Sequence, residues 1–408
     1  MTVEKSLQQA QELILGHCTE TAGEIVSLAD ALHRFPLAPL SNRAPKPAFS
    51  QSTRDGYALG DPGDQNGADP QVLSYTIIGD IAAGDTVLPP LGPGQAVRIT
   101  TGAMVPPNTR CVIPFEICRE QNQRVHINRQ DNRVDDSFIR KRGSDLPAGR
   151  ILVPAGKPIT VDHLPLLAGD GYDRVKVHER PKVSVLCTGS ELIDAGQGKP
   201  HRGQKISGNI FFLEGLISQA GGKCCKLGTV GDDISSICAI LQRRQAASPH
   251  IIITTGGMGP GKYDLMEQVF HDLGGKVLYS RLRVRPGKAT LFGTLGSILF
   301  FALPGPPPAV RLLFQELIEP ALFRMQGADS PLPRTLRARL TVALPRRGRS
   351  AALILKGGVL DEDRGCLTVR AAEKLEPIDC IITLPPHCRF PQPDDAITIH
   401  CPRFRRVF

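Results

Sequence analysis

The chain has 408 residues, of which 41% are apolar and 22% charged, and this composition excludes disordered, fibrous and coiled-coil proteins. At roughly 150 residues per domain, it is long enough for two or three globular domains. Lys and Arg outnumber Asp and Glu by 49 to 40, a formal charge of +9. Such an excess fits a nucleic-acid surface, an anionic small-molecule ligand or an ordinary solvated face. With 5% aromatic residues, no Trp and no recognised nucleic-acid-binding module, we expect no nucleic-acid partner.

The sequence also limits where the protein works. No apolar segment approaches the roughly 18 residues of a transmembrane helix, and residues 1–15 are polar and amphipathic, unlike a signal peptide. The eleven cysteines are scattered without a Cys-x-x-Cys pair, so we expect neither a disulfide framework nor a four-thiolate zinc site. His387-Cys388 and His400-Cys401 fall in expected strands, where adjacent side chains point to opposite faces, which disfavours zinc there too. We expect a cytoplasmic protein without a membrane partner.

The first half of the chain is predicted to form two interleaved domains. Residues 1–46 have helical and extended patterns, and residues 141–178 look like a return to the same elongated N-terminal domain. Between them, residues 47–140 contain short strands such as 72–78, separated by Gly and Pro turns. This pattern predicts an inserted small β domain.

The second half is predicted to form an α/β domain followed by a β domain, so the fold class is multidomain α/β plus β. Residues 179–327 alternate apolar strands with amphipathic helices, the pattern of a central three-layer α/β/α domain with a mostly parallel sheet. Residues 328–408 alternate apolar and polar side chains and predict a C-terminal β-barrel-like domain. In the central domain we expect strands at 183–187, 251–254 and 298–303, and helices at 210–220, 234–244, 265–273 and 309–325.

Each expected central strand is followed by a loop rich in glycine or small polar residues, at 188–191, 254–261 and 304–307. In an open parallel sheet the carboxyl ends of the strands form the ligand crevice, where backbone N–H groups bind phosphate and other oxyanions. One Gly-Gly loop is usually only a tight turn, but three in one domain favour an oxyanion site. Arg285 and Lys288 flank a nearby turn and could clamp a tetrahedral dianion, the alternative being a solvated turn.

Several of the expected loops carry acidic residues, namely Asp55, Glu191, Asp232, Asp233 and Asp264. If some converge, they can hold Mg²⁺ beside a phosphate, because Mg²⁺ takes one or two carboxylates together with phosphate oxygens. Taken singly, each is more typical of a helix cap, since Asp264 precedes one expected helix and Asp232-Asp233 another. Both interpretations stay open at this point.

Seven motifs occur in the order seen in molybdopterin molybdenumtransferases. They are Pro47–Ala58, Arg98–Ala103, Arg142–Asp145, Thr188–Leu192, Gly256–Asp264, Arg285–Lys288 and Leu303–Pro307. The chain therefore resembles the MoeA family, which is also represented by the gephyrin E domain. The resemblance covers nearly the whole chain and is strongest between residues 180 and 326.

The resemblance implies a transferase of molybdenum cofactor biosynthesis. Such an enzyme takes adenylylated molybdopterin and molybdate as substrates, inserts the metal into the dithiolene of the pterin and releases AMP with the assistance of Mg²⁺. It also implies a homodimer in which the central domain lies against the inserted β domain of the partner. The pterin-adenylating protein and molybdoenzymes are the protein partners that the resemblance implies.

Matched position by position, the resemblance implies a site assembled from several loops. The implied catalytic residues are Asp55, Thr101, Glu191 and Asp264. The implied metal ligands are Asp55, Glu191 and Asp264. The residues implied to bind the pterin nucleotide and molybdate are Gly189, Ser190, Asp232, Asp233, Gly256, Gly257, Arg285, Lys288, Pro304, Gly305 and Pro307.

Some positions depart from the family pattern. Arg54 precedes Asp55, Ser190 replaces an acidic residue, and the segments Met258–Gly261 and Pro306–Ala309 lack hydroxyl and amide groups of the family loops. Each lost polar group can cost ~1–3 kcal/mol where it contacts a buried ligand atom. Two alternatives to the enzyme therefore stay open: a catalytically weakened paralogue that binds a molybdopterin nucleotide, and a scaffold that delivers the cofactor.

Overall fold

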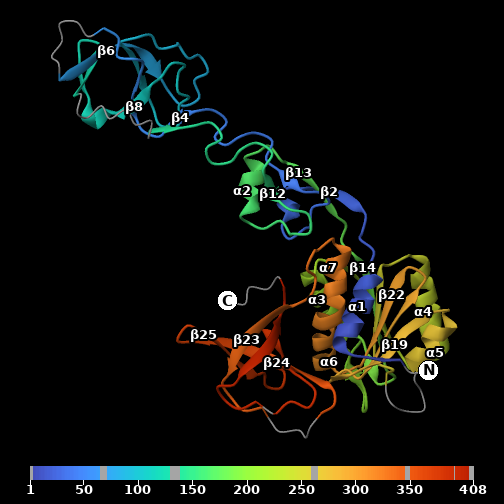
Figure 1. Ribbon diagram of the computed structural model, residues 1–408. Helices are drawn as coiled ribbons and strands as arrows, with labels where there is room; N and C mark the ends of the chain where they lie inside the picture. The colour runs from blue at the N-terminus through green and yellow to red at the C-terminus, as the bar shows by residue number, and fades with distance from the viewer. Residues whose placement is uncertain are drawn as a thin grey trace. The chain divides into compact units, whose positions relative to one another are not determined.

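The structure, a computed structural model, describes residues 3–64, 71–128, 138–258, 265–344, 350–389 and 391–403. The chain divides into two compact units. Unit 1 comprises Met1–Ala38, Ala155–Thr160 and Arg174–Phe408, and unit 2 comprises Pro39–Pro154 and Val161–Asp173. The predicted multidomain α/β plus β architecture is confirmed (Figure 1).

Unit 1 is built on a seven-stranded sheet in the order β1-β19-β21-β22-β18-β14-β17. Four neighbouring strands run parallel: β17 (Lys223–Val230), β14 (Lys182–Thr188), β18 (Ile251–Thr255) and β22 (Ile298–Leu303). The last three are buried almost throughout, as expected of parallel strands with helices on both faces. The predicted strands at 183–187, 251–254 and 298–303 and the mostly parallel sheet are thereby confirmed.

The remaining strands extend this sheet beyond β22. β21 (Ala289–Leu295) and β19 (Lys276–Leu282) pair antiparallel, and β1 (Glu4–Lys5) adds a short parallel strand at the edge. The sequence groups residues 1–46 with 141–178, but Glu4 and Lys5 pair with Arg281 and Leu282 of the central sheet. The start of the chain is therefore part of the central fold, while the predicted bounds of the four domains stay a prediction.

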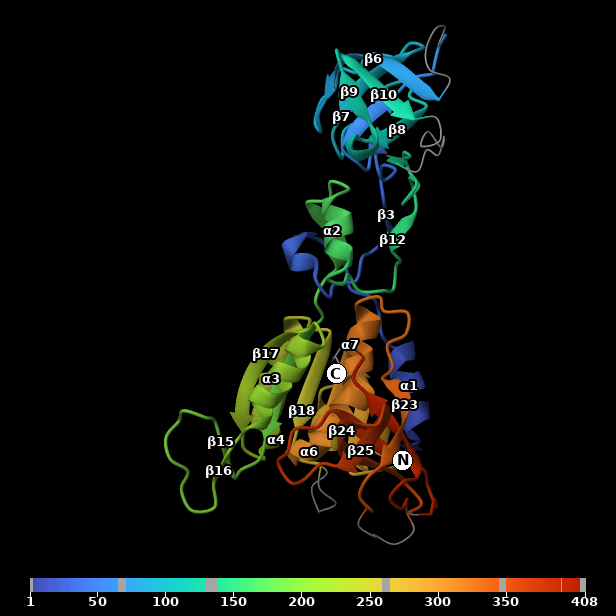
Figure 2. The ribbon, with the colours of Figure 1, turned by 90° about the vertical axis from the view of Figure 1, so that its left-hand side faces the viewer.

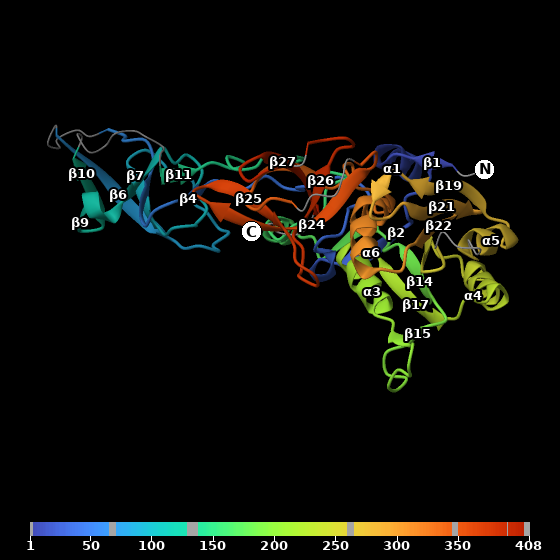
Figure 3. The same ribbon diagram turned by 90° about the horizontal axis from the view of Figure 1, so that it is seen from below.

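Helices cover both faces of the sheet (Figures 1 and 3). Leu265–Asp272 (α5) and Ile234–Ala246 (α4) pack on one face with Ile237, Leu241 and Val269 buried. The other face is covered by α1 (Leu7–Gly16), α3 (Asn209–Gln219) and a continuous helical segment of α6 (Pro307–Leu313), the π-helical turn η4 (Phe314–Ile318) and α7 (Glu319–Met325). All four predicted central helices are confirmed.

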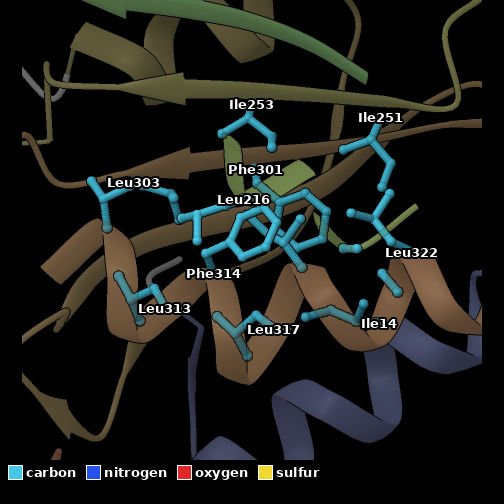
Figure 4. Close-up of a cluster of buried hydrophobic side chains, with 14 of the residues drawn as sticks. Ile14, Leu216, Ile251, Ile253, Phe301, Leu303, Leu313, Phe314, Leu317 and Leu322 are labelled. Atoms are coloured by element: carbon cyan, nitrogen blue, oxygen red, sulfur yellow. The ribbon is translucent and has the colours of Figure 1, made fainter. Parts of the chain in front are cut away.

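The main core lies between the sheet and this second layer. Figure 4 shows Ile253 and Phe301 of the strands beside Leu216 of α3 and Phe314 of η4. Ile14 of α1 belongs to the same buried cluster. The apolar residues of the first helix are therefore buried by a segment that follows some 300 residues later in the chain.

The C-terminal part of unit 1 is a β barrel, as predicted. A strand of the central domain, β20 (Val284–Arg285), pairs with β24 of the barrel. The barrel strands β24-β25-β23-β27-β26 follow one another in space, and the pairing of β24 with β26 closes the ring. Their bounds are β23 (Arg334–Leu340), β24 (Leu353–Asp363), β25 (Cys366–Ala371), β26 (Cys380–Leu384) and β27 (Ala396–Cys401).

Unit 2 contains a six-stranded sheet in the order β8-β5-β7-β6-β10-β9, which matches the predicted inserted β domain. Its strands are β5 (Gly56–Leu59), β6 (Val72–Ile81), β7 (Gln95–Ile99), β8 (Cys111–Pro114), β9 (Arg119–Gln121) and β10 (Arg124–Asn128). Apolar residues on its two faces form separate clusters, one with Leu59 and Tyr75 and one with Ala58 and Val97. The rest of unit 2 includes β3 (Leu40–Ser41), β12 (Ile151–Val153) and α2 (His163–Ala168).

Among the helices that the structure describes, none combines the length and apolar character needed to cross a bilayer.

A matched pair of isoleucines tests the packing of the central sheet. Ile253 in β18 is fully buried, whereas Ile25 in β2 (Gly23–Ser27) is 66% exposed. We expect Ile253→Ala to lower the free energy of unfolding by about 2–5 kcal/mol, because the packed core refills the cavity only in part. Ile25→Ala should change it by no more than about 0.5 kcal/mol. Urea unfolding followed by circular dichroism measures both, and equal losses would contradict this description of the core.

Candidate functional site

A cavity of about 800 Å³, called the first cavity below, opens at the carboxyl ends of β14, β18 and β22. Because these strands are parallel, the loops after them meet at one edge of the sheet. Of the predicted site residues, Gly189, Glu191, Asp232, Gly256, Gly257, Gly305 and Pro307 all line this cavity. The predicted crevice therefore gathers loops that are far apart in the sequence.

Two of these glycines allow close contacts that a side chain would block. A Cβ atom on Gly256 would lie 2.1 Å from the carbonyl oxygen of Thr188, and its φ of +99° is one that other residues rarely adopt. A Cβ atom on Gly189 would lie 2.8 Å from Oε2 of Glu191. The loops after β14 and β18 are thus in direct backbone contact, and the Glu191 carboxylate lies over its own loop.

The structure separates the neighbouring acids Asp232 and Asp233. Asp232 lines the first cavity, and its Oδ2 accepts a hydrogen bond of 3.1 Å from the backbone N–H of Ser190. Asp233 is the N-cap of α4 and accepts from the backbone N–H of Ser236 at 2.8 Å. Hydrogen bonds from the Ser236 hydroxyl and backbone hold the pKa of Asp233 below its usual value. Asp264 lies outside the described residues.

Among the described residues, Glu191 and Asp232 are the carboxylates that line the first cavity. Within the described ranges, no group of three or more His, Cys, Asp and Glu side chains could hold a metal ion. One or two carboxylates completed by phosphate oxygens are, however, the donors that Mg²⁺ takes. The donor set therefore fits a Mg²⁺ ion that binds together with a phosphorylated ligand.

Sequence reasoning missed two polar residues of the first cavity, Ser207 and Asn209. Asn209 Nδ2 donates to Gly305 O at 2.7 Å and to Thr255 Oγ1 at 3.3 Å, which fixes this side chain between two loops. Its Oδ1 and the Ser207 Oγ are buried without a hydrogen-bond partner in the described part of the chain. Buried polar atoms are nearly always paired, so these two point to a bound ligand.

The first turn of α3 also faces this cavity, since Gly208 and Asn209 are among its lining residues. In the described structure no side chain caps α3, and its first backbone N–H groups are open to a ligand. The signal in the sequence was Ser207-Gly208-Asn209 just before an apolar helical run, which is typical of a helix start. Figure 2 shows that the chain between β15 (Leu192–Ile193) and β16 (Lys205–Ile206) makes a long excursion before reaching this turn.

A second cavity, of about 1120 Å³, lies between α6 and the C-terminal barrel. Its walls include the apolar residues Pro308 and Leu312 of the helix and Leu355 of β24. Four basic residues also line it, namely Arg285, Arg311, Lys356 and Lys374. Pro307 lines both cavities, so the two adjoin at the start of α6.

The predicted turn Arg285–Lys288 borders the second cavity. Arg285 is exposed and lines it, and the turn is closed by a hydrogen bond of 2.9 Å from Leu282 N to Lys288 O. Pro304 follows β22 directly and is half-buried. Pro306, Pro307 and Pro308 have no N–H group, so the start of α6 presents apolar rings rather than hydrogen-bond donors.

Asp55 and Thr101 lie together in unit 2. Asp55 Oδ1 accepts hydrogen bonds from the Thr101 backbone N–H at 2.7 Å and from the Thr101 hydroxyl at 3.0 Å. The backbone bond first, and then the hydroxyl bond, hold the pKa of Asp55 below its usual value. Asp55 is thus an exposed carboxylate in a fixed orientation, while Glu191, Asp232 and Arg285 belong to unit 1.

Two family models match consecutive parts of the chain. The model described as MoeA N-terminal region (domain I and II) matches residues 5–171, and the one described as probable molybdopterin binding domain matches residues 184–324. Together they match residues of both units, and neither extends into the C-terminal barrel.

Curated relatives and a solved structure are similar over most of the chain. The molybdopterin molybdenumtransferase of Nostoc sp. is 31% identical over 307 residues, covering 74% of this chain and 70% of that protein. The molybdopterin molybdenumtransferase 1 of Mycobacterium tuberculosis is 28% identical and covers 90% of this chain and 89% of that protein. The structure of the molybdopterin biosynthesis moea protein from Pyrococcus horikosii has a TM-score of 0.84 at 24% identity, covers 98% of this chain and 99% of that chain, and supports the fold.

Two glycine substitutions test whether the first cavity binds an oxyanion. In Gly256→Ala the new Cβ would clash with Thr188 O, so we expect AMP, used as a phosphate-bearing probe, to bind roughly tenfold or more weakly. Gly215→Ala on α3 is the control, because a Cβ there meets nothing within 4 Å. Isothermal titration calorimetry measures both affinities. Unchanged affinity in Gly256→Ala would show that AMP binds elsewhere.

Proposed function

The chain belongs to the molybdopterin molybdenumtransferase (MoeA) family, and we propose that it inserts molybdenum from molybdate into adenylylated molybdopterin with release of AMP. The protein is a transferase of molybdenum cofactor biosynthesis. The observation that carries the detailed reaction is the first cavity, where three glycine-containing loops and the start of α3 converge. The alternatives of a weakened paralogue and a delivery scaffold are not favoured, because transferases match over 74% to 90% of the chain.

The first cavity is proposed to bind the nucleotide part of the substrate. Its volume of about 800 Å³ lies in the usual range of small-molecule sites. The backbone of Gly256 and Gly257 and the uncapped N–H groups of α3 suit phosphate oxygens. The unpaired Ser207 Oγ and Asn209 Oδ1 can hydrogen-bond the remaining polar groups of the nucleotide.

Molybdate is proposed to bind where the second cavity adjoins the first. Arg285 lines the second cavity and Lys288 lies at the other end of the same turn, so two cations are near one another. They balance the charge of the MoO₄²⁻ dianion, and a guanidinium can donate two parallel hydrogen bonds to it. The shared Pro307 places this anion beside the nucleotide.

The proposed mechanism relies on orientation and charge balance rather than on a covalent protein nucleophile. Glu191 and Asp232 would hold Mg²⁺, which when bound neutralises phosphate charge and polarises the phosphoanhydride. The glycine loops and the first turn of α3 bind the phosphate, and Arg285 orients molybdate beside the pterin. The two dithiol sulfurs bind molybdenum, one oxide of molybdate leaves as water with their two protons, and hydrolysis of the phosphoanhydride by water releases AMP. The prolines at the start of α6 place no backbone hydrogen-bond donor between the two anions.

We also propose a homodimer in which Asp55 and Thr101 of one subunit complete the site of the other. The exposed Asp55 carboxylate, oriented by two hydrogen bonds from Thr101, supports this role because its orientation is already fixed for a ligand outside its own loop. The family's N-terminal model spans the segment that carries both residues. The same proposal includes the pterin-adenylating protein and molybdoenzymes as partners.

The cytoplasm is the proposed compartment of the protein. All eleven cysteines are free thiols, and Cys366 is exposed, which fits a reducing environment.

A release assay tests the proposed reaction. The purified protein, given adenylylated molybdopterin, Mg²⁺ and molybdate, should release AMP. Arg285→Ala should raise the molybdate concentration for half-maximal rate by roughly tenfold or more, because a charge-assisted contact to the dianion is lost. Arg283→Ala, an exposed arginine two residues away, is the matched control and should leave this concentration unchanged. Nucleotide binding without any AMP release would contradict the proposed reaction.

Mixed dimers test whether the site is shared between subunits. Asp55→Ala and Glu191→Ala should each be inactive alone. If each site takes Asp55 from one subunit and Glu191 from the other, random mixing restores about one quarter of wild-type activity, since half the dimers then hold one intact site. The control is a mixture of Asp55→Ala with the Asp55→Ala, Glu191→Ala double variant, which forms no intact site. Absence of restored activity in verified mixed dimers would show that the site is not shared.

A further inference from the structure

A buried ion pair joins the long helical segment to the C-terminal barrel. Glu316 lies in the π-helical turn η4, and its side chain is fully buried. His400 Nδ1, from β27, lies 2.9 Å from Oε1 and 3.1 Å from Oε2 of this carboxylate. The preceding residue, Gln315, donates from Nε2 to the backbone oxygen of His400 at 3.0 Å. Two consecutive residues of η4 therefore hold one residue of the barrel.

The first helix of the chain also contributes to this joint. Gln11 of α1 donates from Nε2 to the backbone oxygen of Glu316 at 3.0 Å and to its Oε2 at 3.3 Å. A π-helical turn is rare and is frequently found at functional sites. Here the widened turn presents both a carbonyl and a carboxylate of the same residue to partners from two other elements.

The joint connects the two walls of the second cavity. Leu312 lines that cavity one helical turn before Glu316, and Leu355 of β24 lines it from the barrel. The barrel meets the central domain a second time where Arg285 of β20 pairs with Ile354 of β24. The strand pair and the Glu316–His400 contact are thus two of the attachments that hold the barrel wall near Arg285, beside the packing of Leu355 and Ile381 in the main core.

We propose that Glu316 and His400 form a protonation-dependent clamp that holds the barrel wall of the second cavity against the helical segment. Both are positioning residues, because Glu316 acts on the cavity through Leu312, and His400 acts through β26, which pairs with both β27 and β24, rather than by touching a ligand. This role goes beyond the reaction proposed above and rests on contacts within unit 1 alone.

The charges around the pair determine the direction of its pH dependence. Burial lowers the pKa of His400, but the hydrogen bond that its Nδ1–H donates to the Glu316 carboxylate, and the negative charge of that carboxylate, raise it, and the net pKa lies above the ordinary value of 6.5. Among the described residues, Glu316 is the one charged group that shifts the pKa of His400. The surrounding elements also carry Glu12 of α1, Arg311 of α6, Glu319 of α7, and Arg334, Arg337 and Arg339 of β23.

The direction of this pH dependence follows from the linkage between proton binding and folding. The pKa of His400 is higher in the folded protein than in the unfolded chain. The stability that the charged imidazole adds to the folded state is therefore fully present below about pH 6.5 and is lost as the pH rises through the folded pKa. Above that pH the imidazole is neutral, and the Glu316 carboxylate stays buried without a cation, which is unfavourable. The clamp is therefore tight in mild acid and looser in mild base.

Hydrogen–deuterium exchange of β20 and β24 tests the clamp in the full-length protein. After correction for the intrinsic pH dependence of exchange, protection of residues 284–285 and 353–357 should fall roughly tenfold between pH 6 and pH 9, as expected when one charge-assisted hydrogen bond weakens. Glu316→Gln should remove this pH dependence. His271→Gln, a largely exposed histidine on α5, is the control and should retain it.

Two further measurements keep the outcome interpretable. The affinity for AMP should be unchanged in Glu316→Gln, because residues of the central domain alone line the first cavity. Unchanged affinity would show that this variant is folded. The imidazole resonance of His400 in the wild-type protein should titrate above pH 6.5, which requires no variant. A His400 pKa at or below 6.5, or equal pH dependence of exchange in Glu316→Gln and the wild type, would overturn the proposal.

Discussion

The parallel direction of β17, β14, β18 and β22 is the constraint on which the rest of unit 1 depends. Strands that share a direction and are buried on both faces need a helix after each strand to return the chain. Every return begins at the same edge of the sheet, so glycine loops, acidic residues and the first turn of α3 gather there. The location of the first cavity is therefore set by the direction of the strands rather than by any single side chain.

Much of this domain was predictable because burial on both faces leaves a simple signal. β14, β18 and β22 are short continuous apolar runs, and α4 repeats its buried residues at helical spacing. β24 has a much weaker sequence signal, although it is the longest barrel strand. Its middle residues are Gly357 and Gly358, and the side chains of Ile378 and Cys380 occupy the space where their side chains would lie. The two glycines interrupt the alternation of apolar and polar residues that would indicate a strand. The strand conformation of this segment is therefore determined by tertiary packing rather than by the local preferences of its residues.

The site was predictable in part, for a similar reason. Adjacent acids such as Asp232 and Asp233 are equally suited to a cap and to a ligand contact, and only the backbone decides which one faces the cavity. Ser207 and Asn209 resemble ordinary helix-start residues, and their unpaired atoms become apparent only once Thr255 and Gly305 are placed beside them. Glu316 was a visible anomaly, an acid within an apolar helical run, but its partner His400 is 84 residues away.

The pairing of the first residues with the last part of the central domain has a consequence for synthesis on the ribosome. Gln11 contacts Glu316 across 305 residues, and Leu7, Ala10 and Ile14 belong to a core that α7 completes. At about 5–20 residues per second, some 15–60 s pass between the emergence of these two segments. During that interval the nascent amphipathic helix has no native partner for its apolar face, so this face stays exposed to solvent until the later segment is made.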